Sequence, residues 1–282
     1  MKNNLQSLID SFLEYLDLVR GYSEQTVITY SVVLRQMLDK CEFYEEEGKQ
    51  ILDIMSFRLE IASNNKRTIT KKLSAIRSFA NYLNDHRDMA VKLKGDASIK
   101  VPQTLPKPIE EDYIDEVLSK ADLADRLLVS MLYGLGLRIS ELSGLELGQI
   151  SKTWIEIVGK GNKSRQLPIM PYLQNLIKEY REVYAPKNHL FEKRGIALNS
   201  AQLRYKIDKL FRAQGIKATP HQLRHSFATH LLNNGARISD VSELLGHSSM
   251  ATTQVYTKLA SAKKLDEYMK AHPLVGKLEI RN

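Results

Sequence analysis

The residues most suited to chemistry lie in one stretch near the end of the chain, where TPHQLRHSFATHLL begins at Thr219. Thr219 is a good N-cap residue, so a helix is expected to begin directly after it. The unpaired N–H groups at such a helix end favour an anion. His221 and Arg224 are three positions apart and therefore share one face of the first turn, where both can reach the same oxyanion.

The sequence that follows adds a histidine and a tyrosine to this pair. A second helix is expected to end at Gly246, which places His247 just past that end and Tyr256 nine positions further on. A tyrosine phenol with an ordinary pKa of about 10 is a poor nucleophile at neutral pH, so Tyr256 would need a base and nearby positive charge. Its phenolate would be a good leaving group when a DNA hydroxyl attacks the phosphotyrosine, which permits strand exchange without nucleotide hydrolysis.

Two further segments offer cations for the same phosphate. Arg138, in GLRISEL, precedes a helix that Ser140 can cap, and with Arg224 it would form a bidentate clamp on phosphate oxygens. Lys160 and Lys163 lie in the glycine-bearing turn of a predicted hairpin, where a lysine could donate a proton to the departing oxygen. The combination indicates cleavage of a phosphodiester bond without a metal ion.

Metal binding by this segment is a weaker reading of the same residues. His221 and His225 match the spacing of a zinc-binding pair, but Gln222 occupies the position where a zinc protease needs glutamate. Arg224 would also place a cation beside the metal. We therefore expect no metal and no cofactor, and we expect His225 and His230 to be packing or helix-surface residues.

The composition favours a folded protein with a polyanionic partner. The chain has 282 residues, of which 43% are hydrophobic, and a net charge of +8. Beyond Pro106 there are 26 Lys and Arg against 19 Asp and Glu (+7), whereas residues 1–106 have 15 against 14 (+1). This asymmetry suggests nucleic acid, although a modestly basic solvated surface would explain it equally well. Cys41 is the single cysteine, which fits a reducing cytoplasm, and the sequence predicts no membrane association.

The first part of the chain is predicted to hold four helices. Apolar residues recur with helical spacing over 5–19, over a segment capped by Ser23, over 51–61 and over 68–83. The last of these helices has a basic outer face suited to a phosphate backbone, although such a face is often simply solvated. The predicted DNA-binding residues are those of this face together with one hairpin arginine: Lys66, Arg67, Lys71, Lys72, Arg77 and Arg165.

Periodicity fails near Pro102, Pro106 and Pro108, which indicates a linker. The predicted organisation is an N-terminal four-helix domain over 1–93, a linker over 94–108 and a second domain over 109–282. Within the second domain helices resume and are interrupted by a β-hairpin over 154–170. The fold class is therefore mainly α, with a small β-hairpin or sheet in the larger domain.

Four motifs carry a family resemblance. GLRISEL, GKGNKSR, HQLRHSFATHLL and LGHSSMATTQVYTKLA resemble, in order, the four boxes of tyrosine site-specific recombinases, the phage integrase family, and are closest to its Xer type. The segments SFLEYLDLVRGYSEQTVITY and TITKKLSAIRSFANYL resemble its N-terminal SAM-like core-binding domain. The resemblance implies a catalytic set in which Lys163 is the alternative to Lys160 and Glu141 is an acidic residue just behind the reacting groups: Arg138, Lys160, His221, Arg224, His247 and Tyr256.

The resemblance also implies a mode of action. Family members form a C-shaped clamp on double-stranded DNA, and four protomers exchange strands between two duplexes through a 3′-phosphotyrosine intermediate and a Holliday junction, without metal or ATP. The expected role is resolution of chromosome dimers at cell division, by a homotetramer or a heterotetramer with a paralogue, with a DNA translocase of the FtsK type as a possible partner. A C-terminal helix near 263–269 could dock in cis or on a neighbouring protomer.

Three alternative functions remain open at this point. A phage or transposon integrase would use the same residues at a different DNA site. A type IB topoisomerase would use a similar constellation as a monomer. A catalytically silent DNA-binding protein could retain the scaffold, although all six catalytic positions are filled here.

Overall fold

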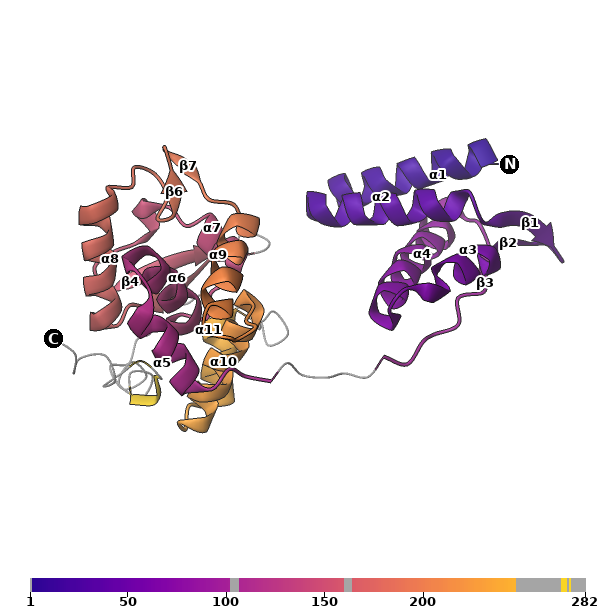
Figure 1. Ribbon diagram of the computed structural model, residues 1–282. Helices are drawn as coiled ribbons and strands as arrows, with labels where there is room; N and C mark the ends of the chain where they lie inside the picture. Colours follow the sequence, from indigo (N-terminus) through magenta and orange to yellow (C-terminus); the bar gives the residue numbers. More distant parts are fainter. Residues whose placement is uncertain (1, 102–106, 160–163, 247–269, 273, 275–282) are drawn as a thin grey trace. The chain divides into compact units, whose positions relative to one another are not determined.

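The computed structural model describes residues 2–101, 107–159, 164–246, 270–272 and 274. The chain divides into two compact units, Met1–Thr104 and Leu105–Asn282, each with its own hydrophobic core (Figure 1). Both units are predominantly helical, as the sequence predicts. Among the described residues, no helix combines the length and apolar character that crossing a bilayer requires.

The helices of the first unit pack their apolar faces into one core that contains Phe12, Leu34 and Phe79, each at most 1% exposed. Ser23 has an extended backbone and precedes the second helix, as expected for an N-cap residue. The helices, with the short helical turns that follow two of them, are α1 (Lys2–Glu14) with the π-helical turn η1 (Tyr15–Val19), α2 (Glu24–Leu38), α3 (Met55–Glu60) with the 3₁₀ turn η2 (Ile61–Ser63), and α4 (Lys66–Arg87).

The expected helix over 51–61 is wrong in its first half. Residues Lys49–Asp53 form strand β2, which pairs antiparallel with β1 (Glu42–Glu46), and only Met55–Glu60 is helical. Glu47 and Gly48 both have positive φ, 49° and 73°, which is the backbone of a two-residue turn that matches the twist of a hairpin. Strand pairing therefore overrides the helical spacing of the apolar residues here.

The first residues of the predicted linker make contacts within the first unit. Lys94 ends strand β3 (Val91–Lys94), which lies parallel to β2 and completes a three-stranded sheet in the order β1-β2-β3. Beyond that strand, Asp96 pairs with Arg77 of α4 at 2.9 Å, and the Ala97 carbonyl accepts a bond from Arg58 at 3.1 Å. The chain is thus attached to the first unit through at least residue 97.

The second unit is built around α6 (Leu123–Gly134), whose residues from Leu127 to Gly134 are all buried. Helices α8, α9 and α10 contact α6 (Figure 1). The remaining helices, with one short 3₁₀ turn, are α5 (Glu111–Lys120), α7 (Ile139–Ser143), η3 (Leu147–Gln149), α8 (Pro171–Tyr184), α9 (Ser200–Arg212), α10 (Pro220–Asn233) and α11 (Ile238–Leu245).

The hairpin predicted inside this unit is present. Strand β4 (Trp154–Val158) pairs antiparallel with β5 (Ser164–Pro168), and Val158 faces Ser164 next to the turn. The alternating burial of β4 directs Ile155 and Ile157 into the core. A second, two-residue hairpin was not predicted and joins β6 (Glu192–Lys193) to β7 (Ile196–Ala197).

Candidate functional site

Arg138 begins the short helix α7 and is fixed by the acidic residue three positions later. The sequence predicts Ser140 as the cap, but the N-cap position belongs to Arg138, whose backbone N–H donates to Glu141 Oε2 at 2.7 Å. The Arg138 guanidinium donates to Glu141 Oε1 at 2.8 Å and to the Gly246 carbonyl at 3.5 Å. Its side chain is 42% exposed, so it is accessible to a ligand.

Arg165 reaches the same carboxylate from strand β5. Its two terminal nitrogens donate to the two oxygens of Glu141, each at 2.9 Å, and its Nε donates to the Leu244 carbonyl at 3.0 Å. The side chain is only 11% exposed. Arg165 therefore joins three parts of the chain that are distant in sequence: the start of α7, the hairpin and the end of α11.

Arg224 lies in the first turns of α10 and is the most deeply buried of the three arginines, at 7% exposed. Its Nη1 and Nη2 donate at 2.6 Å to the carbonyls of Gly136 and Leu245, and Nη1 is 4.0 Å from Glu141 Oε2. Burial lowers the pKa of Arg224 to about 10, and the positive charges of Arg138 and Arg165 act in the same direction. Arg224 remains charged at neutral pH.

These residues form a group that we call the arginine cluster: Arg138, Glu141, Arg165 and Arg224. Burial opposes ionisation of Glu141, but hydrogen bonds from Arg165 and from Arg138 hold the pKa of the carboxyl below its usual value. One carboxylate thus faces three guanidiniums, which leaves a net charge of about +2 in a partly desolvated place. Such a cluster can bind an anion such as a phosphate.

The helix that carries Arg224 starts as the sequence predicts. Thr219 caps α10, because its hydroxyl accepts a bond from the Gln222 N–H at 3.2 Å. His221 is exposed in the first turn, three residues before Arg224. His230, near the other end of α10, is buried, and its Nδ1 lies 2.8 Å from the Tyr133 hydroxyl, which confirms its expected packing role.

Four predicted site residues lie outside the described residues: Lys160, Lys163, His247 and Tyr256. The described ends of their segments nevertheless reach the arginine cluster. Arg165 follows Lys163 by two positions, and Gly246, which accepts a bond from Arg138, directly precedes His247. Gly246 ends α11 with φ of +62°, as expected for a left-handed cap.

The predicted DNA-binding face belongs to α4 in the other unit. Lys66, Arg67 and Lys71 are exposed there. Lys72 donates to Gln36 at 3.0 Å and lies over the Phe57 ring at 5.7 Å.

Arg77 and Arg165, both predicted to bind DNA, are held by acidic residues within the protein. Arg77 is paired with Asp96, and Arg165 is bound within the arginine cluster. The exposed basic side chains of this face lie in the first turns of α4, near Asn65, whose side chain accepts a bond from the Thr68 N–H at 2.8 Å.

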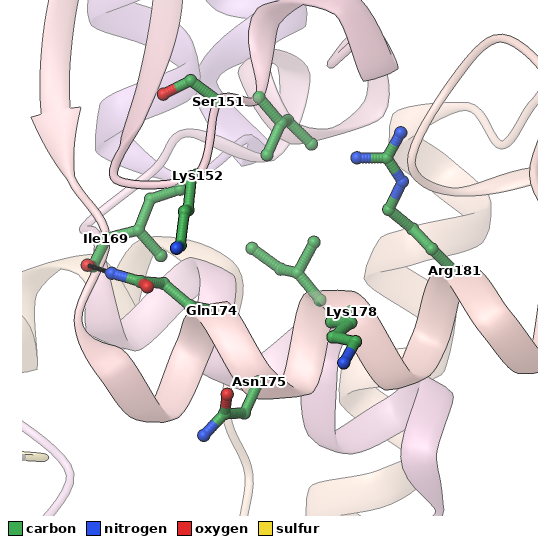
Figure 2. Close-up of a pocket in the computed structure, with 9 residues that line it drawn as sticks. Ser151, Lys152, Ile169, Gln174, Asn175, Lys178 and Arg181 are labelled. Atoms are coloured by element: carbon green, nitrogen blue, oxygen red, sulfur yellow. Dashed lines mark hydrogen bonds between the residues drawn. The ribbon is translucent and has the colours of Figure 1, made fainter.

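A pocket of about 490 Å³ lies elsewhere in the second unit (Figure 2). Its polar lining includes Lys152 before β4 and Lys178 and Arg181 along α8, and Gln174 bonds the Ile169 carbonyl at 2.7 Å. None of its lining residues belongs to the arginine cluster. The pocket is therefore separate from the site built around Glu141.

The described end of the chain packs in cis against the second unit. Ala271, His272 and Leu274 are buried, and His272 Nε2 lies 2.5 Å from the Gly134 carbonyl at the end of α6. The segment 263–269, for which cis or trans docking was left open, lies outside the described residues.

Sequence reasoning missed how the arginines are held. Arg165 was assigned to DNA, and nothing indicated that backbone carbonyls of Gly136 and Leu245 would hold Arg224. The one signal for Arg165 was its place inside the predicted hairpin over 154–170. Backbone carbonyls that accept bonds from Arg224 cannot be identified from residue types.

Comparison with known proteins identifies the family. The Phage integrase family model matches residues 107–263, and the model for the phage integrase N-terminal SAM-like domain matches residues 9–86. The chain belongs to the phage integrase family. Relatives include Tyrosine recombinase XerC of Corynebacterium glutamicum, 33% identical over 96% of this chain and 93% of the relative, and that of Mesorhizobium japonicum, 35% identical over 96% and 97%.

Solved structures support the same fold for this tyrosine recombinase. XerH site-specific recombinase bound to palindromic difH substrate aligns with a TM-score of 0.65 and 22% identity, over 88% of this chain and 78% of that one. A lambda integrase tetramer bound to a Holliday junction aligns with a TM-score of 0.65 and 15% identity, over 89% and 80%. The chain is a DNA strand-exchange enzyme of the Xer type, in agreement with the family that its motifs indicate.

Proposed function

We propose that this Xer-type tyrosine recombinase resolves chromosome dimers by cutting and rejoining DNA at a specific site. The relatives at 33% and 35% identity carry the name XerC and match nearly their whole length. The observation that supports the chemistry most directly is the arginine cluster, in which Arg138 and Arg224 share one buried carboxylate at 2.8 and 4.0 Å. Arg165, which follows the segment with Lys160, belongs to this cluster, and Gly246, which precedes the segment with Tyr256, accepts a bond from Arg138.

In the proposed reaction the phenolic oxygen of Tyr256 attacks the scissile phosphorus. The phenol gives up its proton as the P–O bond to the 5′ oxygen breaks, a 3′-phosphotyrosine forms, and the departing 5′ oxygen takes a proton and leaves as a hydroxyl. Arg138 and Arg224 bind the non-bridging oxygens and stabilise the charge that develops on them. The exposure of the Arg138 guanidinium supports a direct contact with the phosphate, and the buried Arg224 is held by two backbone carbonyls.

Proton transfer is assigned to groups that can titrate or donate. Lys160 is the proposed acid for the departing oxygen, with Lys163 as the alternative, and His221 and His247 flank the phosphate as proton-bearing groups. Guanidiniums neutralise the phosphate charge, so the reaction as proposed needs no metal. It needs no ATP because the phosphotyrosine linkage can be attacked directly. The phosphotyrosine retains the energy of the broken bond, and a second DNA hydroxyl reverses the attack on a new partner strand.

The proposed partner is double-stranded DNA. The related structures contain a Xer recombinase on its substrate and a lambda integrase tetramer on a Holliday junction, and the exposed first turns of α4 carry Lys66, Arg67 and Lys71. The assembly is proposed to be a tetramer on two duplexes, with identical subunits or with a paralogue. A DNA translocase of the FtsK type is proposed to activate it, in the cytoplasm.

The test is covalent capture of the intermediate. The DNA sites that the protein occupies in cells are mapped, and a duplex with the strongest site and a nick near the cleavage position is incubated with the protein in EDTA without nucleotide. A denaturing gel is expected to show a protein–DNA adduct for the wild type and for Tyr205→Phe, a matched change at an exposed tyrosine of α9. Tyr256→Phe is expected to give none.

Equal adduct from Tyr256→Phe would contradict the assigned nucleophile. Binding without any adduct in the wild type would favour a catalytically silent DNA-binding protein. An adduct that requires added Mg²⁺ or ATP would contradict the metal-free and nucleotide-free chemistry. Mapped sites confined to integrated elements would favour an integrase over a resolvase of chromosome dimers.

A further inference from the structure

Arg165 occupies a position that the proposed chemistry does not use. Its two terminal nitrogens bind both oxygens of Glu141 at 2.9 Å, and its Nε binds the Leu244 carbonyl at 3.0 Å. All three nitrogens of the guanidinium therefore donate to acceptors within the protein. With 11% of its side chain exposed, Arg165 is poorly placed to bind a DNA phosphate.

We propose that Arg165 is a positioning residue, which holds Glu141 so that the carboxylate in turn holds the guanidinium of Arg138. This inference rests on the proposed function, and it replaces the DNA-binding role predicted for Arg165 from the sequence. Glu141 Oε1 accepts bonds from both Arg138 and Arg165, so one oxygen links the exposed Arg138 to the largely buried Arg165.

The geometry explains why an arginine is required. A carboxylate that binds one guanidinium through both oxygens has its plane fixed, because the two parallel bonds prevent rotation. Lysine offers a single charged nitrogen without this planar fork, so it would retain the charge and lose the orientation. Without Arg165, the closest remaining side-chain partner of the buried carboxylate among the described residues is Arg138, with Arg224 at 4.0 Å.

Arg165 also connects the hairpin to the chain just before His247. The bond to Leu244 lies at the C-terminal end of α11, where a positive charge is favourable. A Cβ atom added to Gly246 would lie 3.1 Å from Arg165 Nη1, so the side chain packs directly against this residue. One side chain thus sets the position of β5, the end of α11 and Glu141 together.

The experiment measures cleavage and binding separately. Single-turnover adduct formation on the nicked duplex is followed at saturating protein, and the Kd of the uncleaved duplex is measured over a range of salt. Arg165→Gln is expected to slow adduct formation by about 10 to 100-fold, as is typical when a residue that orients an active-site ligand is removed. Its Kd is expected to stay within about twofold of the wild type, with an unchanged salt dependence.

Two further variants sharpen the comparison. Arg165→Lys is expected to recover only part of the rate, because it restores charge without the bidentate geometry. Arg212→Gln removes an exposed arginine that pairs with Asp208 at 2.9 Å on α9, and it is expected to change neither rate nor Kd. Arg165→Lys also serves as the test if Arg165→Gln fails to fold, which the fluorescence of Trp154, the single tryptophan, would show.

The pH profile gives a readout that a purely structural role would not move. Among the described residues, the charged groups facing Glu141 are Arg138, Arg165 and Arg224, so removal of Arg165 is expected to raise the pKa of the carboxyl. The acid limb of the cleavage rate in Arg165→Gln is therefore expected to shift to higher pH.

Each outcome decides the inference. A cleavage rate within twofold of the wild type in Arg165→Gln or Arg165→Lys overturns it. Weaker binding with a shallower salt dependence and an unchanged rate at saturation also overturns it, and restores a phosphate contact. Absence of an adduct in the wild type would instead refute the proposed function, so the two failures are distinguishable.

Discussion

Gly136 is the residue at which a single added methyl group should disturb the arginine cluster most. It has φ of +59°, and its carbonyl accepts the 2.6 Å bond from Arg224 Nη1. A Cβ atom at this position would lie 2.5 Å from a carbon of the buried Phe227 ring and 2.9 Å from Leu245. Gly136→Ala therefore combines backbone strain with a clash against two core side chains.

The magnitude follows from these two contributions. A left-handed backbone costs an L-residue about 1 to 2 kcal/mol relative to glycine. Overpacking in a well-packed core costs about 1 to 3 kcal/mol more. A mid-range loss of about 3.5 kcal/mol lowers the Tm of a unit of this size by roughly 7 to 14 °C.

The assay is thermal unfolding of the full chain, followed by the fluorescence of Trp154. This tryptophan lies in β4, so the signal reports on the second unit. The matched control is Gly215→Ala in the same unit, where φ is +73° but no atom lies within 4 Å of the added Cβ. The control is expected to lose only the backbone contribution of about 1 to 2 kcal/mol.

The two variants should also differ in cleavage. Displacement of the Gly136 carbonyl moves an acceptor of Arg224, so adduct formation is expected to slow in Gly136→Ala and to be unchanged in Gly215→Ala. Equal losses of Tm in the two variants would refute the argument from the Phe227 contact. A normal cleavage rate in a folded Gly136→Ala would refute the link to Arg224.

Two other predictions concern stability. Burial lowers the pKa of His272 to about 4, below its ordinary value near 6.5. The folded state therefore resists protonation of His272, and the free energy of unfolding falls as the pH drops below 6.5. About 2 kcal/mol should be lost between pH 7 and pH 5. Urea midpoints read from Trp154 should show this decline, His272→Asn should remove most of it, and an identical decline in both proteins would contradict the assignment. Asn65→Ala removes the cap of α4 and should cost about 1 kcal/mol by circular dichroism in urea, whereas Asn65→Asp should cost little; equal costs would show that the cap bond is not the cause.

Much of the local structure was predictable because its signals are local. The cap at Thr219, the left-handed end at Gly246 and the hairpin that includes Ile155 depend on residues within a few positions of each other. The helical spacing over 51–61 overextends the helix Met55–Glu60 because the preceding residues pair with β1 across a two-residue turn and with β3, some forty residues later. Periodicity within a window cannot register that pairing.

The residue types of the cluster could be identified from motifs, but their partners could not. Arg138 and Glu141 are three positions apart, so their pairing follows from helix geometry. The pairing of Glu141 with Arg165 spans 24 positions and depends on how the hairpin packs against α7. The sequence shows that Arg165 is charged and therefore suggests a DNA contact, whereas the fold determines that its side chain is largely buried and paired with Glu141.

The sequence alone therefore determined the chemical repertoire of this recombinase: arginines, histidines, lysines and a tyrosine in four ordered motifs, on helices with recognisable ends. Tertiary structure alone decided which of these groups are buried, which carboxylate holds them and which backbone carbonyls complete their bonds. The physical reason is that residue type and spacing fix local geometry, whereas burial and long-range contact depend on the packing of the whole unit.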